Sequence, residues 1–352
     1  MKQHPLMWLI TIIAVVAAAY FAQSAIRPSA DPHTVPQIDL IVGGPDPFWQ
    51  LVIAGAESAA SRYDAKLNVH VPEGTGKAQT EVITRLDTNS SDGIAVSPLA
   101  PIEQTNLLAR NAAKVNLVTY DNDSPHSQRL CYIGSNNWTA GQQCAEILKQ
   151  ALPDGGNVAV FVGDNERQNA KRRILGLMAG LADRSTGTSD TEWNMTDPIE
   201  INGYTLLRCY LDGSDHEQAK ANAAQALVDH PDLQCMVGLY GYSGPMCLEA
   251  LKEADKLGEV KLVAFDEFEA TLAGIEAGHI AGTVVQDPYQ FGFESVRLLA
   301  DISRKPEESA PVPGSGTLYI PCSIVNAENL AEFKAQLKQR IGAVDTAGAE
   351  SG

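Results

Sequence analysis

The stretch QIDLIVGGPDPFWQLV at residues 37–52 decides the fold of this chain. Its first part, Ile38–Val42, is a run of aliphatic residues that predicts a buried β-strand. The glycines and proline at 43–45 end that strand, and apolar residues then recur at helical spacing from Phe48 to Arg62. The stretch therefore predicts a strand, a tight turn and a helix in succession.

The same unit recurs along the chain as far as residue 302. The predicted strands are 38–42, 67–71, 94–97, 116–119, 130–133, 158–162, 205–210, 233–239, 260–265 and 282–285. The predicted helices are 48–62, 77–86, 102–112, 139–152, 170–182, 217–228, 244–254, 272–277 and 291–302. Strands that are apolar throughout and separated by helices indicate parallel sheets covered on both faces. There are enough strands for two such sheets, so we expect a doubly wound α/β protein.

Composition excludes several classes of protein. The chain has 352 residues, which favours two domains. Its net charge of −17 argues against nucleic acid as a partner, because phosphate binding needs a basic face. A mean hydropathy of −0.12 excludes a protein that crosses the membrane many times. The 6 cysteines are too few for a disulfide scaffold, and we expect Cys209 and Cys235, in predicted strands, to be buried free thiols.

The first residues have the layout of a secretory signal. Met7–Ala22 is an uncharged, almost wholly apolar run that follows Lys2, and Ala22-Gln23-Ser24 offers a small-x-small cleavage site. We expect a signal peptide at residues 1–25, or else an uncleaved anchor that tethers the protein to the inner membrane through residues 7–22. Either case, with a linker at 26–36, places the rest of the chain in the periplasm or another extracytoplasmic space.

Polar and aromatic residues follow the predicted strands. Ligands of open parallel sheets bind outside the carboxyl ends of the strands. Aromatic faces cover the C–H groups of a sugar, while carboxylate, guanidinium and amide groups bind its hydroxyls. The mixture therefore favours a polyhydroxylated ligand. The candidate ligand-binding residues are Asp46, Phe48, Trp49, Asp121, Asn122, Arg173, Tyr240, Asp266 and Gln286.

Each candidate also has a structural interpretation. An Asp after a strand often caps the next helix. Phe48 and Trp49 can begin the core face of a helix, and Arg173 can pair with a surface carboxylate. A coincidence of such residues at successive strand ends favours one shared site over separate structural roles.

A series of short motifs in a fixed order resembles a known family. Residues 37 to about 340 are similar to the bacterial periplasmic sugar-binding proteins of the ribose-binding type, which share their fold with the ligand domain of the lac-repressor family. The matching motifs are Asp46-Pro47-Phe48-Trp49, Asp92-Gly93-Ile94-Ala95-Val96-Ser97-Pro98, Asp121, Gly134-Ser135-Asn136-Asn137 with Gly141, Arg173-Ile174-Leu175-Gly176, Ala264-Phe265-Asp266 and Gln286-Asp287-Pro288.

The resemblance implies a type I periplasmic binding protein fold, in which two doubly wound lobes are joined by a three-strand hinge. The N-terminal lobe would comprise residues 37–134 and 288–318. The C-terminal lobe would comprise residues 135–287 and 319–340, and a disordered tail would follow at 341–352.

The resemblance also assigns roles within the site. Phe48 and Trp49 would stack on the sugar ring, and Asp121, Arg173, Asp266 and Gln286 would bind its hydroxyls. Three residues depart from the family pattern. Asp46 stands where the family has Asn, Asn122 where ribose binders have Arg, and Tyr240 where an Asn is usual. We therefore expect a ligand whose hydroxyl pattern differs from that of ribose.

Motifs for catalysis and cofactors match poorly. Gly241–Pro245 resembles a nucleophile elbow, but its second glycine comes one residue early. Gly74–Ala78 lacks the leading glycine and the Ser or Thr of a phosphate-binding loop. The 7 histidines show no metal-ligand spacing. We expect no enzyme activity, no cofactor and no metal, although the pair Asp121 and Asp266 leaves acid–base hydrolysis as the enzymatic alternative.

Taken with the resemblance, these features predict an extracytoplasmic receptor. It would close around a monosaccharide or related polyol and deliver it to the permease of an ABC transporter. The alternative is a sensing receptor on the same fold that presents bound sugar to a membrane kinase or chemoreceptor, which an uncleaved anchor would favour. We expect a monomer without a nucleic-acid partner. Which sugar binds, and how the cysteines pair, stays open at this point.

Overall fold

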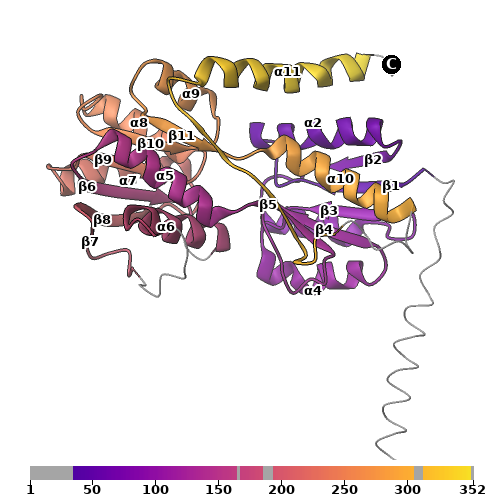
Figure 1. Ribbon diagram of the computed structural model, residues 1–352. Coiled ribbons are helices and arrows are strands. Elements are labelled where there is room, and N and C mark those ends of the chain that lie inside the picture. Colours follow the sequence, from indigo (N-terminus) through magenta and orange to yellow (C-terminus); the bar gives the residue numbers. More distant parts are fainter. Residues whose placement is uncertain (1–34, 165–166, 185–192, 305–311, 350–352) are drawn as a thin grey trace, which may run out of the picture.

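The computed structural model describes residues 35–164, 167–184, 193–304 and 312–349, with side chains up to residue 340. It has two lobes side by side, each built on its own β-sheet (Figure 1). The predicted signal peptide or anchor, and nearly all of the predicted linker, lie outside the described residues. In the part of the chain that is described, no helix is long and apolar enough to cross a membrane.

The first lobe is a parallel six-stranded sheet between two pairs of helices. Its strands, in spatial order, are β12 (Thr317–Ile320), β5 (Cys131–Ser135), β4 (Asn116–Tyr120), β3 (Gly93–Val96), β1 (Gln37–Ile41) and β2 (Lys66–His70). Its helices are α2 (Pro47–Arg62) and α10 (Pro288–Arg304) on one face, and α3 (Gly76–Arg85) and α4 (Pro101–Ala112) on the other. Side chains alternate along β1, so Ile38 and Leu40 pack under α2 and α10 while Ile41 packs against α3 and α4.

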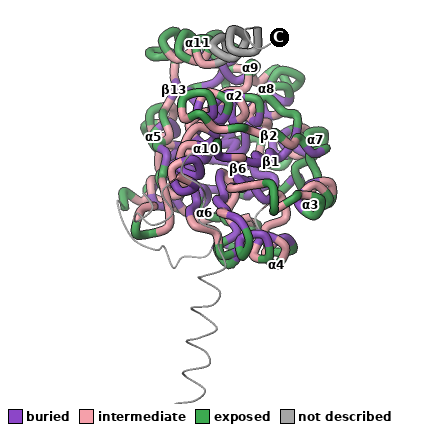
Figure 2. The backbone as a smooth tube through the Cα atoms, turned by 90° about the vertical axis from the view of Figure 1, so that its right-hand side faces the viewer, coloured by how far each residue is buried: buried purple, intermediate pink, exposed green. Residues whose placement is uncertain are grey.

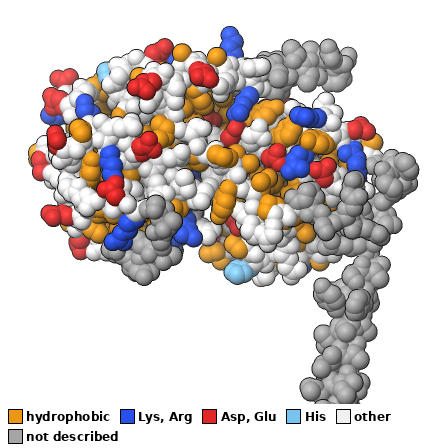
Figure 3. Space-filling view, in the orientation of Figure 1, with side chains coloured by type: hydrophobic (Ala, Val, Ile, Leu, Met, Phe, Trp, Pro, Cys, Tyr) orange, Lys and Arg blue, Asp and Glu red, His pale blue; other side chains and the backbone are white. Residues whose placement is uncertain are grey.

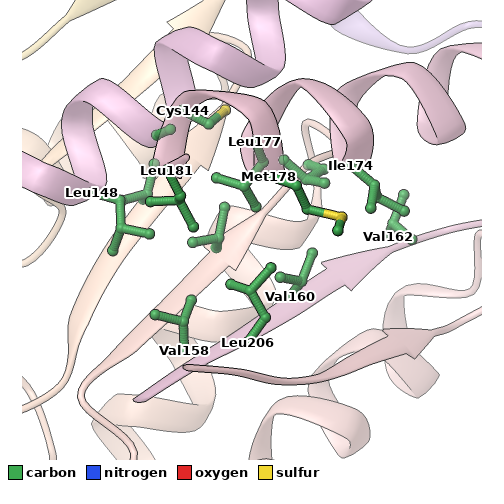
Figure 4. Packing of buried hydrophobic residues seen from close by; sticks show 14 of the residues in the cluster. Cys144, Leu148, Val158, Val160, Val162, Ile174, Leu177, Met178, Leu181 and Leu206 are labelled. Atoms are coloured by element: carbon green, nitrogen blue, oxygen red, sulfur yellow. The ribbon is translucent and has the colours of Figure 1, made fainter. Parts of the chain in front are cut away.

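The second lobe is a seven-stranded sheet whose two edge strands are antiparallel. Its strands, in spatial order, are β13 (Ser323–Val325), β11 (Gly282–Val285), β10 (Lys261–Phe265), β9 (Cys235–Gly238), β6 (Gly156–Val162), β8 (Tyr204–Leu211) and β7 (Ile199–Ile201). Helices α5 (Asn137–Ala151) and α6 (Gln168–Leu181) cover one face, and α7 (His216–Asp229), α8 (Ser243–Glu253) and α9 (Glu269–Glu276) cover the other. Figure 4 shows Leu177 and Met178 of α6 above Val160 of β6 in this core.

Three segments cross between the lobes. The chain passes from β5 to α5, returns from β11 to α10, and crosses again from β12 to β13 (Figure 1). As a result β12 pairs with β5 of the first lobe, while β13 pairs with β11 of the second. The predicted fold, two doubly wound lobes joined by a three-strand hinge, is confirmed.

Helix α11 (Leu330–Ala349) was not among the helices expected from the sequence. It runs along the top of the view in Figure 1. Leu330, Phe333 and Leu337 pack against the core of the second lobe, and the helix also contacts α2 of the first. The structure continues this helix to Ala349, whereas the sequence predicted a disordered tail from residue 341. Gly342, Gly348 and the β-branched Val344 and Thr346 have low helix propensity, so there was little local sign that the helix continues.

Packing, rather than cross-linking, holds both lobes together. The strands form the buried interior in Figure 2, and the helices expose their outer faces. All six cysteines carry free thiols, and five of them are buried. Cys209 in β8 and Cys235 in β9 are among the buried ones, as predicted.

Candidate ligand-binding cleft

Two aspartates, one in each lobe, are presented by the same local geometry. Asp121 follows β4 and Asp266 follows β10, and their φ angles are +56° and +60°. Each backbone N–H donates to a carbonyl of the next strand, at 3.0 Å and 2.8 Å. Each backbone carbonyl accepts a hydroxyl from that strand, Tyr132 Oη or Thr283 Oγ1, at 2.8 Å. Asp adopts the left-handed conformation more readily than most residues, and here it turns the chain at the same point after a strand in both lobes.

Arg173 is a buried cation without a carboxylate in contact. It lies on α6 with 3% of its surface exposed. Nε donates to Asn137 Oδ1 and one Nη donates to the Leu239 carbonyl, both at 2.8 Å. The guanidinium also stacks on Phe265 at 3.9 Å from the ring centre. Within the described residues no carboxylate lies within 4.0 Å of it, so neutral groups fix its position while its charge stays available to a ligand.

The charges of the two lobes influence one another across the cleft. Burial raises the pKa of Asp121 to about 6, although the Arg173 charge and a hydrogen bond from Ser97 act in the opposite direction. Burial also raises the pKa of Asp266, again against the effect of Arg173. Gln286 Nε2 donates to Asp266 Oδ1 at 3.1 Å. We call Asp121, Arg173, Asp266 and Gln286 the inner cluster.

Two amide side chains connect the lobes beside the inner cluster. Asn169 of α6 donates from Nδ2 to Oδ1 of Asn122 in the first lobe, at 3.3 Å. Asn122 in turn donates to Asp121 at 2.9 Å, and Tyr240 donates to Asn169 at 3.4 Å. The lobes therefore touch at this point. Two predicted ligand-binding residues take part in the contact, Asn122 through Asp121 and Asn169, and Tyr240 through Asn169.

A large cavity opens next to this bridge. Its volume is about 1080 Å³, and residues of both lobes line it, among them Asp121, Asn122 and Asn169. The remaining seven predicted site residues are not part of its wall. On the molecular face drawn in Figure 3, Lys and Arg side chains are interspersed with Asp and Glu.

Among the described residues, Asp46, Phe48 and Trp49 make no hydrogen bond, ion pair or ring contact with the inner cluster. Asp46 is exposed and precedes α2 without capping it through its side chain. Trp49 is 9% exposed and belongs to the core of the first lobe, where it meets Phe48 edge-on at 4.9 Å. The indole lies directly over Gly43, where a Cβ would come 2.2 Å from the ring. Roles for these three residues as ligand contacts stay predictions.

Sequence reasoning left out four polar or aromatic residues that belong to this region. Ser97 donates to Asp121 at 3.0 Å, Asn137 accepts from Arg173, and Asn169 bridges the lobes. Trp138 lines the cavity. Ser97 and Asn137 stand in the motifs quoted above, so position after a strand was the signal that could have identified them.

Two doubly wound lobes, joined by three crossing segments and facing each other with buried charges, define a two-lobed ligand receptor. Comparison with known proteins agrees with this class. Residues 40–307 match the periplasmic binding protein domain, and the chain belongs to that family. The predicted resemblance is therefore confirmed.

Individual relatives are distant but cover most of the chain. The ribose import binding protein of Bacillus subtilis is 22% identical over 259 residues, 73% of this chain and 78% of the relative. The D-allose-binding periplasmic protein of Escherichia coli is 21% identical over 285 residues, 76% of this chain and 85% of the relative.

The chain also aligns with solved structures of the same fold over nearly the whole length of those structures. An ABC transporter solute-binding protein from Burkholderia graminis in complex with D-arabinose has a TM-score of 0.72 and 26% identity, covering 87% of this chain and 98% of that one. A chain of a XylFII–LytSN complex has a TM-score of 0.68 and 20% identity, covering 84% and 99%. At that identity the second likeness shows the fold alone.

Proposed function

We propose that this protein is an extracytoplasmic receptor that binds a sugar between its lobes and delivers it to an ABC transporter. The ligand would be a monosaccharide or related polyol that contacts both lobes. Relatives named for ribose and allose, and a solved solute-binding protein in complex with D-arabinose, support a sugar as the ligand. The lobes would be residues 37–134 with 288–318 and residues 135–287 with 319–340, moving about the three crossing segments.

One observation carries this proposal. Arg173 and Asp266 of the second lobe are buried and Asp121 of the first lobe is partly buried, and their charges act on one another, yet no ion pair joins them within the described residues. Burying charges without direct pairing costs several kcal/mol per ion. Hydroxyl groups of a ligand could donate to both carboxylates and accept from the guanidinium, and so offset that cost.

A ligand screen on the full chain tests the proposal. Pentoses, hexoses and polyols are screened by thermal shift, because a tight ligand raises the unfolding temperature by mass action. Affinity for the best ligand is then measured by calorimetry. Arg173→Ala and Asp266→Asn should each weaken binding at least 100-fold, since each removes a charge-assisted hydrogen bond and leaves its partner unpaired.

Arg110→Ala is the matched control for these variants. Arg110 lies exposed near the end of α4 and does not line the cavity. Its removal should leave affinity unchanged. If no sugar or polyol binds, or if Arg173→Ala binds as tightly as the wild type, the proposed function is wrong.

A second candidate function is sensing. It is favoured by the structural likeness to a chain held in the XylFII–LytSN complex, where this fold is bound by another protein. Deleting the gene separates the two candidates. Loss of sugar uptake supports delivery to a transporter, whereas normal uptake with loss of a sugar-dependent change in gene expression supports sensing. Cell fractionation of the full chain would show at the same time whether it is released to the periplasm or stays with the membrane.

A further inference from the structure

The first half of helix α11 is fixed to the second lobe. Phe333 and Leu337 pack against the core of that lobe, and Leu330 is buried in it. Lys334, on the same stretch, donates to Glu276 of α9 at 2.7 Å. Because apolar packing and an ion pair both hold it there, this part of α11 belongs to the second lobe.

The helix then reaches the first lobe. Figure 1 and Figure 2 both show α11 lying over α2 as well as α9, and it contacts both helices. Arg340 donates from one Nη to Asp287 Oδ1 at 2.9 Å, and its guanidinium lies 5.5 Å from the ring centre of Tyr289. Asp287 directly precedes α10, and Tyr289 lies in the first turn of that helix. Arg340 therefore connects a helix of the second lobe to the start of a helix of the first.

The start of α10 is itself packed tightly into the first lobe. A Cβ on Gly55 of α2 would come 1.8 Å from the carbonyl oxygen of Tyr289, so the two helix backbones are in contact there. The ring of Tyr289 also stacks with Phe293, which packs against the core of the first lobe. The residues that Arg340 holds therefore move with the first lobe.

Arg340 also supplies positive charge near several carboxylates of the hinge. Asp287 directly follows Gln286 of the inner cluster, and Glu267 directly follows Asp266. Glu267 and Arg340 line the same small space, and Glu267 Oε2 is buried there without a hydrogen bond from the described residues. Burial raises the pKa of Glu267, and the charges of Asp266 and Asp287 act in the same direction. The Arg340 charge acts against them, so its removal would leave these carboxylates less compensated.

From these contacts we infer that α11 is a strap that holds the two lobes in the arrangement described above, with Arg340 as the positioning residue at its far end. In this arrangement the lobes also touch through Asn122 and Asn169. A receptor that occupies its binding-competent arrangement for only part of the time binds proportionally more weakly. The strap would therefore raise sugar affinity from outside the cleft, since Arg340 does not line the cavity. The inference rests on the proposed function and adds to it a residue that acts through the arrangement of the lobes.

Calorimetry on the full chain tests the strap with the sugars of the screen, beginning with D-ribose, D-allose and D-arabinose. Arg340→Ala should weaken binding by about 5- to 10-fold, because it removes both a partly buried ion pair and a cation–π contact. Arg340→Lys keeps a positive charge near Asp287 and should recover most of that loss.

Lys334→Ala is the matched control. It removes an ion pair from the same helix, but one that lies wholly within the second lobe. Its affinity should stay within about 2-fold of the wild type. Asp287→Asn offers a second comparison, because Asn can still accept from the backbone N–H of Gln290, as Asp287 does at 3.1 Å, while the charge that Arg340 binds is lost. If the two residues act as one pair, the double variant should lose no more affinity than Arg340→Ala alone.

Small-angle X-ray scattering without sugar tests the strap independently of any ligand. We expect Arg340→Ala to have a larger radius of gyration than the wild type, because lobes that are no longer strapped separate further. Lys334→Ala should have the wild-type radius. This readout would not change if Arg340 only contributed to the stability of the second lobe.

The outcomes separate the strap from the function on which it rests. If Arg340→Ala matches the wild type in affinity and radius, the strap is wrong and the receptor stands. Equal losses in Arg340→Ala and Lys334→Ala, or a loss of affinity with an unchanged radius, would place the effect within one lobe and also overturn the strap. If no sugar of the screen binds the wild type, the proposed function fails, whereas the radii without sugar still decide for or against the strap.

Discussion

Asp121 combines a position on the wall of the cleft with an electrostatic cost to the folded state. Burial raises its folded pKa to about 6, above the ordinary value of 3.8. The native state then holds the proton more tightly than the unfolded chain, so stability should fall as pH rises from about 4 to about 6 and level off above that range. Asp121→Asn should remove this part of the pH dependence and raise stability by about 1–2 kcal/mol at neutral pH, because no charge is then desolvated.

Thermal unfolding of the wild type and of Asp121→Asn, without ligand and between pH 4 and 7.5, measures the difference in their pH dependence. The same variant should bind sugar more weakly, since the neutral amide loses a charge-assisted acceptor. A variant with the same pH profile as the wild type would contradict the assignment of this cost to Asp121.

Trp49 shows how one residue can satisfy a family motif and still serve the core. Its side chain is buried between Gly43 and the rings of Phe48 and Tyr120. Trp49→Ala should therefore lower the free energy of unfolding by about 3–5 kcal/mol, the usual cost of removing a large buried aromatic. Denaturant unfolding measures this loss of free energy, provided that the m-values of the variant and the wild type agree. A loss below 1 kcal/mol with a large fall in sugar affinity would instead place the indole in the cleft.

At the scale of elements, both lobes bring two helices together at paired glycines. Gly141 of α5 and Gly176 of α6 allow backbone contact, because a Cβ on Gly176 would come 2.1 Å from the Trp138 carbonyl oxygen. In the first lobe Gly55 of α2 and Gly292 of α10 play the same part, with Cβ positions 1.8 Å and 1.9 Å from carbonyl oxygens of the other helix. The atoms in the way belong to the backbone, so substitution would have to move a helix.

Gly176→Ala should separate α5 from α6 and lower stability by about 1–3 kcal/mol, as overpacked cores do. It should also weaken sugar binding, because Arg173 lies one turn earlier on α6. Gly314→Ala is the matched control, since no atom lies within 4 Å of the Cβ position there. It should stay within about 0.5 kcal/mol of the wild type. Equal effects of the two substitutions would contradict the packing argument.

Local pattern was a good guide to the elements and a poorer one to the site. The run Ile38–Val42 is aliphatic and ends at glycine, so both the strand and its limit could be predicted. Helix α11 was missed although its pattern was present in the sequence: Leu330, Phe333 and Leu337 recur at helical spacing, and the structure packs these three side chains against the second lobe. A residue's place after a strand located Asp121 and Asp266, but it left open whether Trp49 faces the cleft or the core, and the structure packs it into the core.

At the scale of the whole molecule, we expect the hinge to convert ligand contacts into a change of shape. A ligand shifts the balance between open and closed forms only by its differential affinity for them. Moving a receptor from mostly open to mostly closed takes about 5.5 kcal/mol. Charge-assisted hydrogen bonds contribute about 1.5–3 kcal/mol each, so bonds to Asp121, Arg173 and Asp266 are sufficient when all three can form only with the lobes together.

Removing Arg173 should therefore weaken closure as well as binding. Without the guanidinium, Asp121 and Asp266 face each other across the cleft as like charges, and like charges favour the open form. Small-angle X-ray scattering tests this. We expect the radius of gyration of the wild type to decrease when sugar saturates it, and that of Arg173→Ala to stay larger even at a sugar concentration that fills its site. A wild-type radius that is unchanged at saturation would mean that the pocket is rigid, and that the three crossing segments connect the lobes without acting as a hinge.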